Sequence, residues 1–138
     1  TRGWPRVEAG TIDRPLKVDG KPKAARTRFE VLSTVEIDRP VNRYPTARFS
    51  LMALEPEGGR RHQIRRHLNG FAHPIVGDTS HGDRFQNWFF RDHYDTQRLL
   101  LHAASLRFER PFGGGEVCIE AGPFAPRLLE RVGLTQAG

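Results

Sequence analysis

A dense basic segment runs from residue 59 to residue 68 and offers the most chemistry in the chain. Its side chains that are cationic or can become so are Arg60, Arg61, His62, Arg65, Arg66 and His67. The planar guanidinium of arginine presents its donors in a fork that matches the oxygens of a phosphate group. The segment therefore predicts a surface that binds a nucleic-acid backbone. A basic face that meets only solvent is the plain alternative.

Two aromatic residues farther along the chain, Trp88 and Phe89, fit the same chemistry. Aromatic rings can stack on unpaired bases while neighbouring arginines contact the phosphates. The basic segment and these rings together favour a nucleic acid as the partner.

Metal chemistry is the weaker alternative. The possible ligands are His62, His67, His73, His81, Asp78 and Asp83. No histidine pair has the HExxH spacing, and no cysteine lies nearby, so we expect no metal site. A metal-dependent phosphodiesterase built on His62, His67, His73 and Asp78 stays open. The single cysteine, Cys118, lies between Val117 and Ile119, where we expect a buried thiol without a catalytic role.

The elements that position these residues follow from hydrophobic spacing. Apolar residues alternate over 27–37, with one slip, and again over 46–55, which predicts two antiparallel strands. Ile64, Leu68 and Phe71 share one face of a helix over 60–71. The other predicted elements are an extended segment over 6–16, an exposed loop over 17–26, a short helix from Asn87, strands over 98–109 and 116–120, and a helix over 125–132.

This order of elements indicates an α+β fold with a mainly antiparallel or mixed sheet and flanking short helices. The chain has 138 residues, a length typical of one domain, and its hydrophobic content of 37% is too high for a disordered protein. No apolar run approaches the roughly 18 residues that span a bilayer. One cysteine cannot form an internal disulfide, which favours the cytoplasm. The net charge of +6 favours polyanionic partners.

Three motifs, in this order along the chain, resemble the RluA family of pseudouridine synthases. They are residues 59–68, then His73 to Asp78 with His81-Gly82-Asp83, and then 98–103. Residues 42–48, the doubled Arg65-Arg66 and residues 78–83 are similar to members of the family that isomerise uridine 65 of tRNA. The resemblance covers nearly all of residues 1–134.

The resemblance implies a pseudouridine-synthase-like fold, an isomerase that needs no cofactor and no metal, and tRNA as the partner. It also implies no membrane partner, and we expect a monomer. By the family motif, Arg65 is the partner of a nucleophilic aspartate. The remaining expected substrate-binding residues are Arg60, Arg61, His62, Gln63, Arg66, Leu99 and Leu101. For the two leucines, ordinary strand core is an equal alternative.

One part of the family pattern is missing from this sequence. The nucleophilic aspartate of the family lies in a His-Arg-Leu-Asp motif in the first half of the catalytic domain, and no such motif occurs here. The chain also lacks an initiator methionine. We therefore expect residues 1–138 to be the C-terminal part of a single catalytic domain, inactive alone. An RNA-binding module without catalysis is the alternative.

Overall fold

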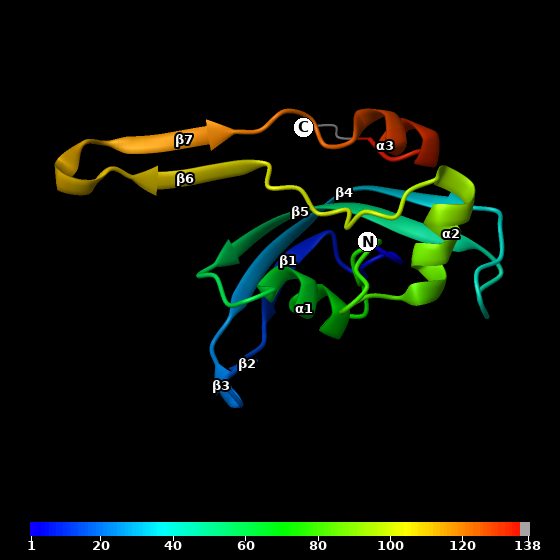
Figure 1. Ribbon diagram of the computed structural model, residues 1–138, viewed down its shortest axis with the longest axis horizontal. Helices are drawn as coiled ribbons and strands as arrows, with labels where there is room; N and C mark the ends of the chain where they lie inside the picture. The colour runs from blue at the N-terminus through cyan, green and yellow to red at the C-terminus, as the bar shows by residue number, and fades with distance from the viewer. Residues whose placement is uncertain (136–138) are drawn as a thin grey trace.

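A three-stranded antiparallel sheet is the centre of the computed structural model, which describes residues 1–135 (Figure 1). Its strands are β1 (Ala9–Asp13), β4 (Arg26–Ile37) and β5 (Ala47–Glu57), in the order β1-β4-β5. The antiparallel pair predicted from alternating apolar residues is confirmed, and the predicted slip is a bulge between Val31 and Ser33. Strand β5 continues through Pro56, where we expected a turn, because one edge of β5 is largely unpaired and needs no N–H there.

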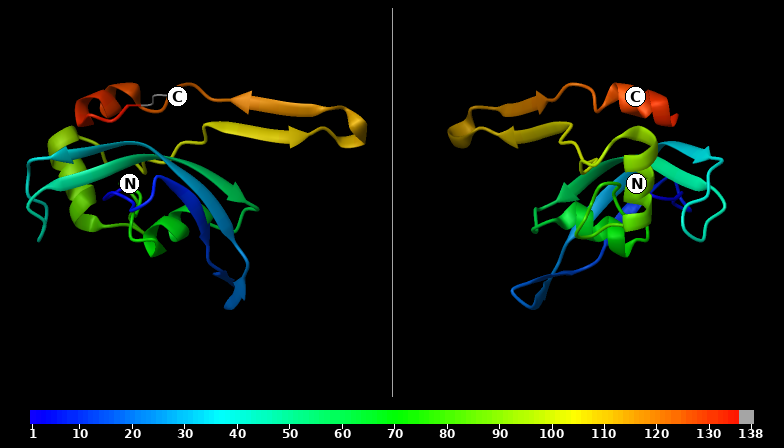
Figure 2. Two further views of the ribbon diagram at one scale, coloured as in Figure 1. Left: turned by 180° about the vertical axis from the view of Figure 1, so that it is seen from behind. Right: turned by 45° about the vertical axis from the view of Figure 1, so that its right-hand side comes forward.

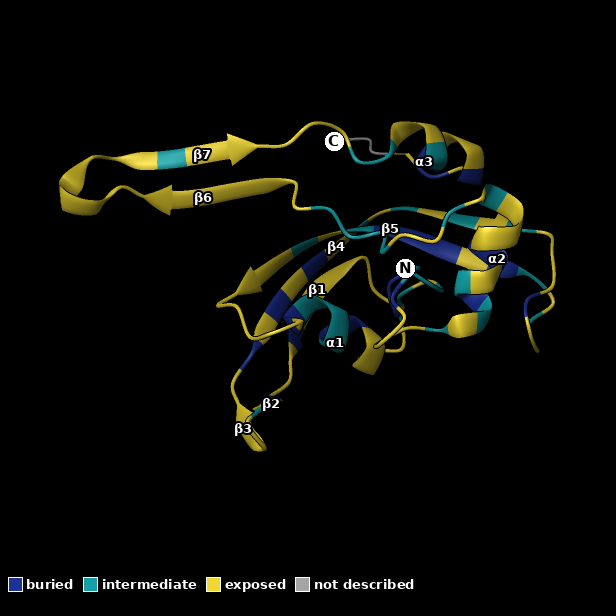
Figure 3. Ribbon diagram, viewed as in Figure 1, coloured by how far each residue is buried: buried dark blue, intermediate teal, exposed yellow. Residues whose placement is uncertain are grey.

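The segment 17–26, predicted to be a loop, instead contains a small hairpin. Strands β2 (Leu16–Val18) and β3 (Lys21–Lys23) pair across Asp19 and Gly20, whose φ angles are 52° and 78°. Two consecutive positive φ angles are what a tight two-residue hairpin turn requires, and Asp-Gly is a favoured pair for it. The expectation that the segment is exposed holds for most of its residues (Figure 3).

Three helices complete the fold: α1 (Gln63–Gly70), α2 (Arg84–Tyr94) and α3 (Pro126–Val132). Helix α1 begins at Gln63, whereas the predicted helix began at residue 60. Helix α2 begins before Asn87 because the Asp83 side chain accepts hydrogen bonds from the N–H groups of Phe85 and Gln86 and caps the helix. None of the helices in residues 1–135 is long and apolar enough to cross a membrane.

A second hairpin, of strands β6 (Ser105–Glu109) and β7 (Glu116–Glu120), projects away from the central sheet (Figures 1 and 2). A single 3-10 turn, η1 (Pro111–Gly113), lies in its connection, and residues 98–104 form no strand, in contrast to our prediction. Because neither face of this hairpin is covered, Cys118 is exposed, and the predicted buried thiol was wrong. Alternation shows which side chains share a face, but not whether anything packs on it.

Two apolar clusters hold the helices on the sheet. Phe49 of β5 packs edge-on against Phe90 of α2, with the ring centroids 4.7 Å apart, and α3 joins this cluster through Leu129. The other cluster holds α1 against the sheet through Leu68 and Phe29. Helices α1 and α2 are thus fixed by separate clusters, and the segment 71–83 joins them.

Candidate functional site

An ion pair between Arg65 of α1 and Asp78 lies at the centre of the candidate site. Arg65 Nε donates to Oδ2 of Asp78 and Nη2 donates to Oδ1, each over 2.9 Å. The side chain of Asp78 is 0% exposed and that of Arg65 is 18% exposed. This two-point contact fixes both the position and the plane of the guanidinium.

The Asp78 carboxylate is itself held by backbone donors. The N–H groups of Ser80 and His81 donate to Oδ1 over 3.1 and 2.8 Å. Burial raises the pKa of Asp78, but the hydrogen bonds from Arg65, His81 and Ser80 outweigh burial and lower the pKa to about 2. Asp78 therefore remains a carboxylate throughout the physiological pH range.

The loop that carries Asp78 is fastened on both sides. Asn87 of α2 accepts a hydrogen bond from Gly77 N over 2.8 Å and donates one to the Asp78 carbonyl over 3.0 Å. Gly77 has a φ of +88°, and a Cβ atom there would lie 1.9 Å from the carbonyl oxygen of Arg98; a Cβ atom on Gly82 would lie 2.0 Å from that of Asp78. Both positions therefore require glycine.

Arg65 keeps donors for a second anion. A guanidinium has five N–H donors, and Asp78 accepts two of them. The remaining donors and the partial exposure of the side chain allow Arg65 to contact a carboxylate or a phosphate oxygen from another group. The hydrogen bonds with Asp78 raise the pKa of Arg65, so its charge is permanent.

Two histidines lie beside this ion pair. His62 precedes α1 with a left-handed φ of 53°, and its Nδ1 lies 3.4 Å from Nε2 of His81. Partial loss of hydration, together with the positive charges of Arg65 and Arg61, lowers the pKa of His62. The lowered pKa favours the neutral ring of His62, which is able to donate or accept a hydrogen bond.

Three other arginines of the basic segment border the site: Arg60, Arg61 and Arg66. Arg60 donates from Nε to the carbonyl of Ala24, and Arg66 donates to the carbonyls of Arg61 and Lys17, so both also hold the β2–β3 region. Arg61 is exposed. Within residues 1–135, no carboxylate pairs with any of the three. The arginines therefore present uncompensated positive charge.

Gln63 and His67 lie in the interior, in contrast to our predictions. Gln63 Nε2 donates to Thr27 Oγ1 over 3.2 Å, and Thr27 Oγ1 lies 2.7 Å from His67 Nδ1. His67 Nε2 lies 2.8 Å from the carbonyl of Arg14, which assigns the ring proton to Nε2 and leaves Nδ1 to accept from Thr27. The amide of Gln63 also bonds Arg26 and Arg60, so we no longer include Gln63 in a substrate-binding surface.

The apolar residues expected to contact the substrate differ in how far they are buried. Leu99 and Leu101 are half-buried in the irregular segment 98–104 and pack against the cluster around Leu68. Leu101 also lines, with Ile64, an apolar cavity of about 510 Å³ that extends toward α3. Of the two aromatic residues predicted to stack on bases, Trp88 is exposed, whereas Phe89 is buried against Phe49 and is not available.

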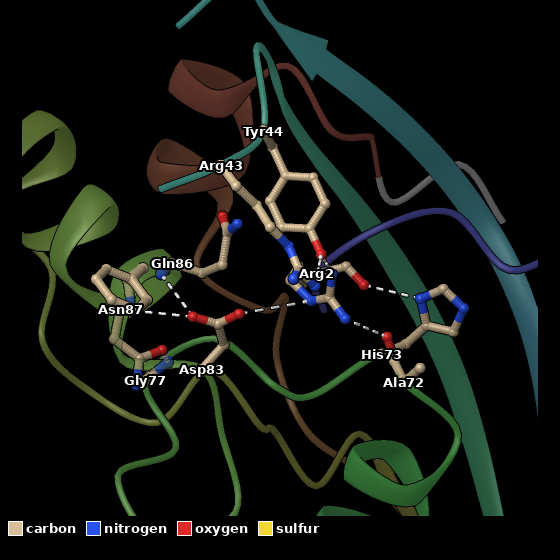
Figure 4. Close-up of polar contacts among 10 residues, drawn as sticks. Arg2, Arg43, Tyr44, Ala72, His73, Gly77, Asp83, Gln86 and Asn87 are labelled. Atoms are coloured by element: carbon tan, nitrogen blue, oxygen red, sulfur yellow. Dashed lines mark hydrogen bonds and ion pairs between the residues drawn. The ribbon is translucent and has the colours of Figure 1, made fainter. Parts of the chain in front are cut away.

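The residues considered as metal ligands have other partners. His73 Nδ1 lies 2.9 Å from the Arg2 carbonyl, and Asp83 lies 3.8 Å from Arg2 Nε (Figure 4). Arg2 also donates to the carbonyl of Ala72 and to the hydroxyl of Tyr44. These contacts fasten the first residues of the chain to the segment 72–83. In the part of the chain that the structure describes, no three His, Cys, Asp or Glu residues are placed to hold a metal ion.

Comparison with known structures places this fold among the pseudouridine synthases. The structure of human RNA Pseudouridylate Synthase Domain Containing 1 is similar with a TM-score of 0.64 and 26% identity, over 92% of this chain and 54% of that one. The chain is also a homologue of proteins named tRNA pseudouridine synthase C. The relative from Salmonella typhi is 41% identical over 88% of this chain, and that from Vibrio parahaemolyticus is 42% identical over 87%.

These comparisons confirm the resemblance read from the sequence motifs. The chain spans about half the length of the curated relatives, 51% of the Salmonella typhi protein and 53% of the Vibrio parahaemolyticus protein. A scan of protein-family models matched none.

Proposed function

We propose that residues 1–138 are the C-terminal part of a pseudouridine synthase that isomerises uridine in tRNA, with position 65 as its target. The observation that carries the proposal is the Arg65–Asp78 ion pair, bordered by uncompensated arginines, in a chain about 41% identical to proteins named tRNA pseudouridine synthase C. The cytoplasm is the expected compartment and a monomer the expected state.

The reaction needs an ionised carboxylate near a permanent cation. Pseudouridine formation breaks the bond between the ribose C1′ and N1 of uracil, rotates the base, and forms a bond from C1′ to C5. The proton on C5 is exchanged for one on N1, so substrate and product are isomers and no cofactor is consumed. Arg65, aligned by Asp78, has donors left for a nucleophilic carboxylate, whose pKa a neighbouring guanidinium would lower.

The basic rim supplies affinity for the RNA. Arg60, Arg61 and Arg66 would contact phosphates, which position a nucleic acid without reading its sequence. His62, whose lowered pKa favours the neutral ring, would donate or accept a hydrogen bond at the same rim. Leu99 and Leu101 would provide an apolar floor for the flipped uracil, whose removal from a stem costs a few kcal/mol.

A fusion protein tests this function. The N-terminal half of the Salmonella typhi relative, which would supply the His-Arg-Leu-Asp motif, is joined ahead of Thr1. We expect the fusion to form pseudouridine in tRNA, whereas the chain alone binds tRNA without converting it. A folded fusion that binds tRNA and forms no pseudouridine would contradict the proposal and leave an RNA-binding module.

A further inference from the structure

A second cavity, of about 230 Å³, lies between helix α2 and the loop that carries Asp78. Its walls include Gly77 and Asp78 of the loop, Arg84, Trp88 and Arg91 of α2, and Gln97 beyond the helix. Asp78 thus belongs both to the Arg65 ion pair and to the wall of this cavity.

Trp88 is unusual among the aromatic residues of α2. The residue is 45% exposed, whereas Phe89 and Phe90 are 5% and 3% exposed. Within residues 1–135, the indole N–H of Trp88 donates no hydrogen bond. Phe85 packs against the Trp88 ring, with the two ring centroids 5.5 Å apart. The rest of the ring is exposed beside the cavity and its N–H donor is unused, so a planar ligand would bury both.

Two guanidinium groups flank this ring. Arg84 and Arg91 lie one turn before and after Trp88 on α2, and the Cζ atom of each is 5.9 Å from the centroid of the indole ring. Arg84 has no carboxylate partner in the described part of the chain, and Arg91 pairs only with its exposed neighbour Asp92 over 2.9 Å. An exposed pair of this kind is worth little, so both cations remain available to an anion.

The other tryptophan shows what a purely structural arrangement looks like. Trp4 donates from its indole N–H to the Val35 carbonyl over 3.1 Å. Arg48 covers its ring at 4.3 Å from the centroid and is itself neutralised by Glu36. Trp4 is thus satisfied within the protein, and it does not line the cavity beside α2.

We propose that the cavity beside α2 binds an unpaired nucleotide of the RNA substrate. The base would stack on Trp88 and the adjoining phosphates would lie between Arg84 and Arg91, the combination of ring and cations that recognises single strands. The inference rests on the proposed function in assuming an RNA ligand. It adds a contact with single-stranded RNA near the Arg65 site. This contact lies on helix α2, outside the basic segment 59–68.

Fluorescence titration tests the stacking contact. In Trp4→Phe, Trp88 is the only tryptophan, and a short single-stranded oligouridylate should quench its emission, whereas a duplex RNA of equal length should not. Trp88→Ala should weaken oligouridylate binding by about 5- to 150-fold, the range expected for one lost base stack, while Trp4→Phe leaves the affinity unchanged. Equal quenching by the duplex would overturn the proposal.

Arginine variants separate this proposal from the proposed function. Arg84→Gln with Arg91→Gln keeps the tryptophan and should reduce the salt dependence of oligouridylate binding. Circular dichroism of each variant confirms that it folds. If Trp88→Ala and the double variant bind oligouridylate and tRNA as the unchanged chain does, while Arg61→Gln weakens tRNA binding, the α2 site is wrong and RNA binding at the basic rim stands. If no RNA binds the folded chain, both proposals are overturned.

Discussion

Arg65 and Asp78 are joined through two hydrogen bonds of 2.9 Å, with the carboxylate fully buried and the guanidinium partly open to solvent. One side of the guanidinium is thereby occupied by a carboxylate of this chain itself. Asp78 acts on any further ligand of Arg65 by fixing the direction of the remaining donors, and is in that sense a positioning residue. From the sequence, Asp78 was part of a family motif, and the one role weighed for its side chain was that of a metal ligand.

Replacing Arg65 should separate catalysis from binding. In the fusion, Arg65→Met keeps the length of the side chain and its helix propensity but removes the charge. We expect single-turnover formation of pseudouridine to fall by orders of magnitude while tRNA affinity changes little. The exposed Arg61→Met is the matched control and should weaken binding and its salt dependence with nearly unchanged single-turnover chemistry at saturating enzyme. A near-normal rate in Arg65→Met would refute the role of Arg65.

Asp78 should make the free energy of unfolding depend on pH in the acid range. Its pKa is about 2 in the folded chain and about 3.9 when unfolded, so the stabilisation is complete above pH ~4 and is lost as the pH falls toward 2. The shift corresponds to roughly 2–3 kcal/mol. Urea unfolding between pH 2 and 6 measures this loss, and Asp78→Asn should show a smaller dependence. An identical pH dependence in the two proteins would exclude Asp78 as its source.

Thr27 should be important for stability although it takes no part in the ion pair. Its hydroxyl links Gln63 to His67, and the residue is 0% exposed. Thr27→Val keeps the shape but leaves Nδ1 of the buried His67 without a hydrogen-bond donor and removes one of the hydrogen bonds of Gln63 Nε2. The cost of leaving one buried polar group unpaired is about 1–3 kcal/mol. Thr34→Val, at an exposed position of the same strand, should change the free energy of unfolding by less than about 0.5 kcal/mol. Equal effects would show that the network contributes nothing.

Gly77 should tolerate no side chain. Gly77→Ala forces a Cβ atom to within 1.9 Å of the Arg98 carbonyl, so the loop must move and Asp78 must lose its alignment with Arg65. Gly58→Ala is the control, because Gly58 also has a positive φ but has nothing within 4 Å of the added atom. The control should cost only the roughly 1 kcal/mol of a left-handed alanine. Thermal unfolding of both variants measures the difference, and equal melting temperatures would contradict the close approach.

The elements predicted most accurately from the sequence are those with a regular apolar period. Strands β4 and β5 and helix α3 follow from spacing and from local stop signals such as Gly133. The β2–β3 hairpin was missed because its lysines conceal any alternation, although Asp19-Gly20 was a readable turn signal.

The candidate site was only partly predictable, because its polar contacts join distant segments. The motif singled out Arg65, but its partner Asp78 comes from a loop after α1, and the burial of His67 depends on Thr27 in strand β4. Hydrophobic spacing does not reveal such pairs. A Gly-Asp step followed by small polar residues, as at 77–80, was the available signal that the Asp78 carboxylate accepts backbone N–H groups.

The exposed apolar residues of the β6–β7 hairpin should affect the solubility of the protein more than its stability. Leu106, Phe108 and Ile119 lie on one of its faces and are 59%, 43% and 54% exposed. Because these side chains contribute little to the packed interior, changing them to polar residues would leave the unfolding transition almost where it is. The same changes would alter how the chain behaves as its concentration rises, since an open apolar strand face is where copies of a protein adhere to one another.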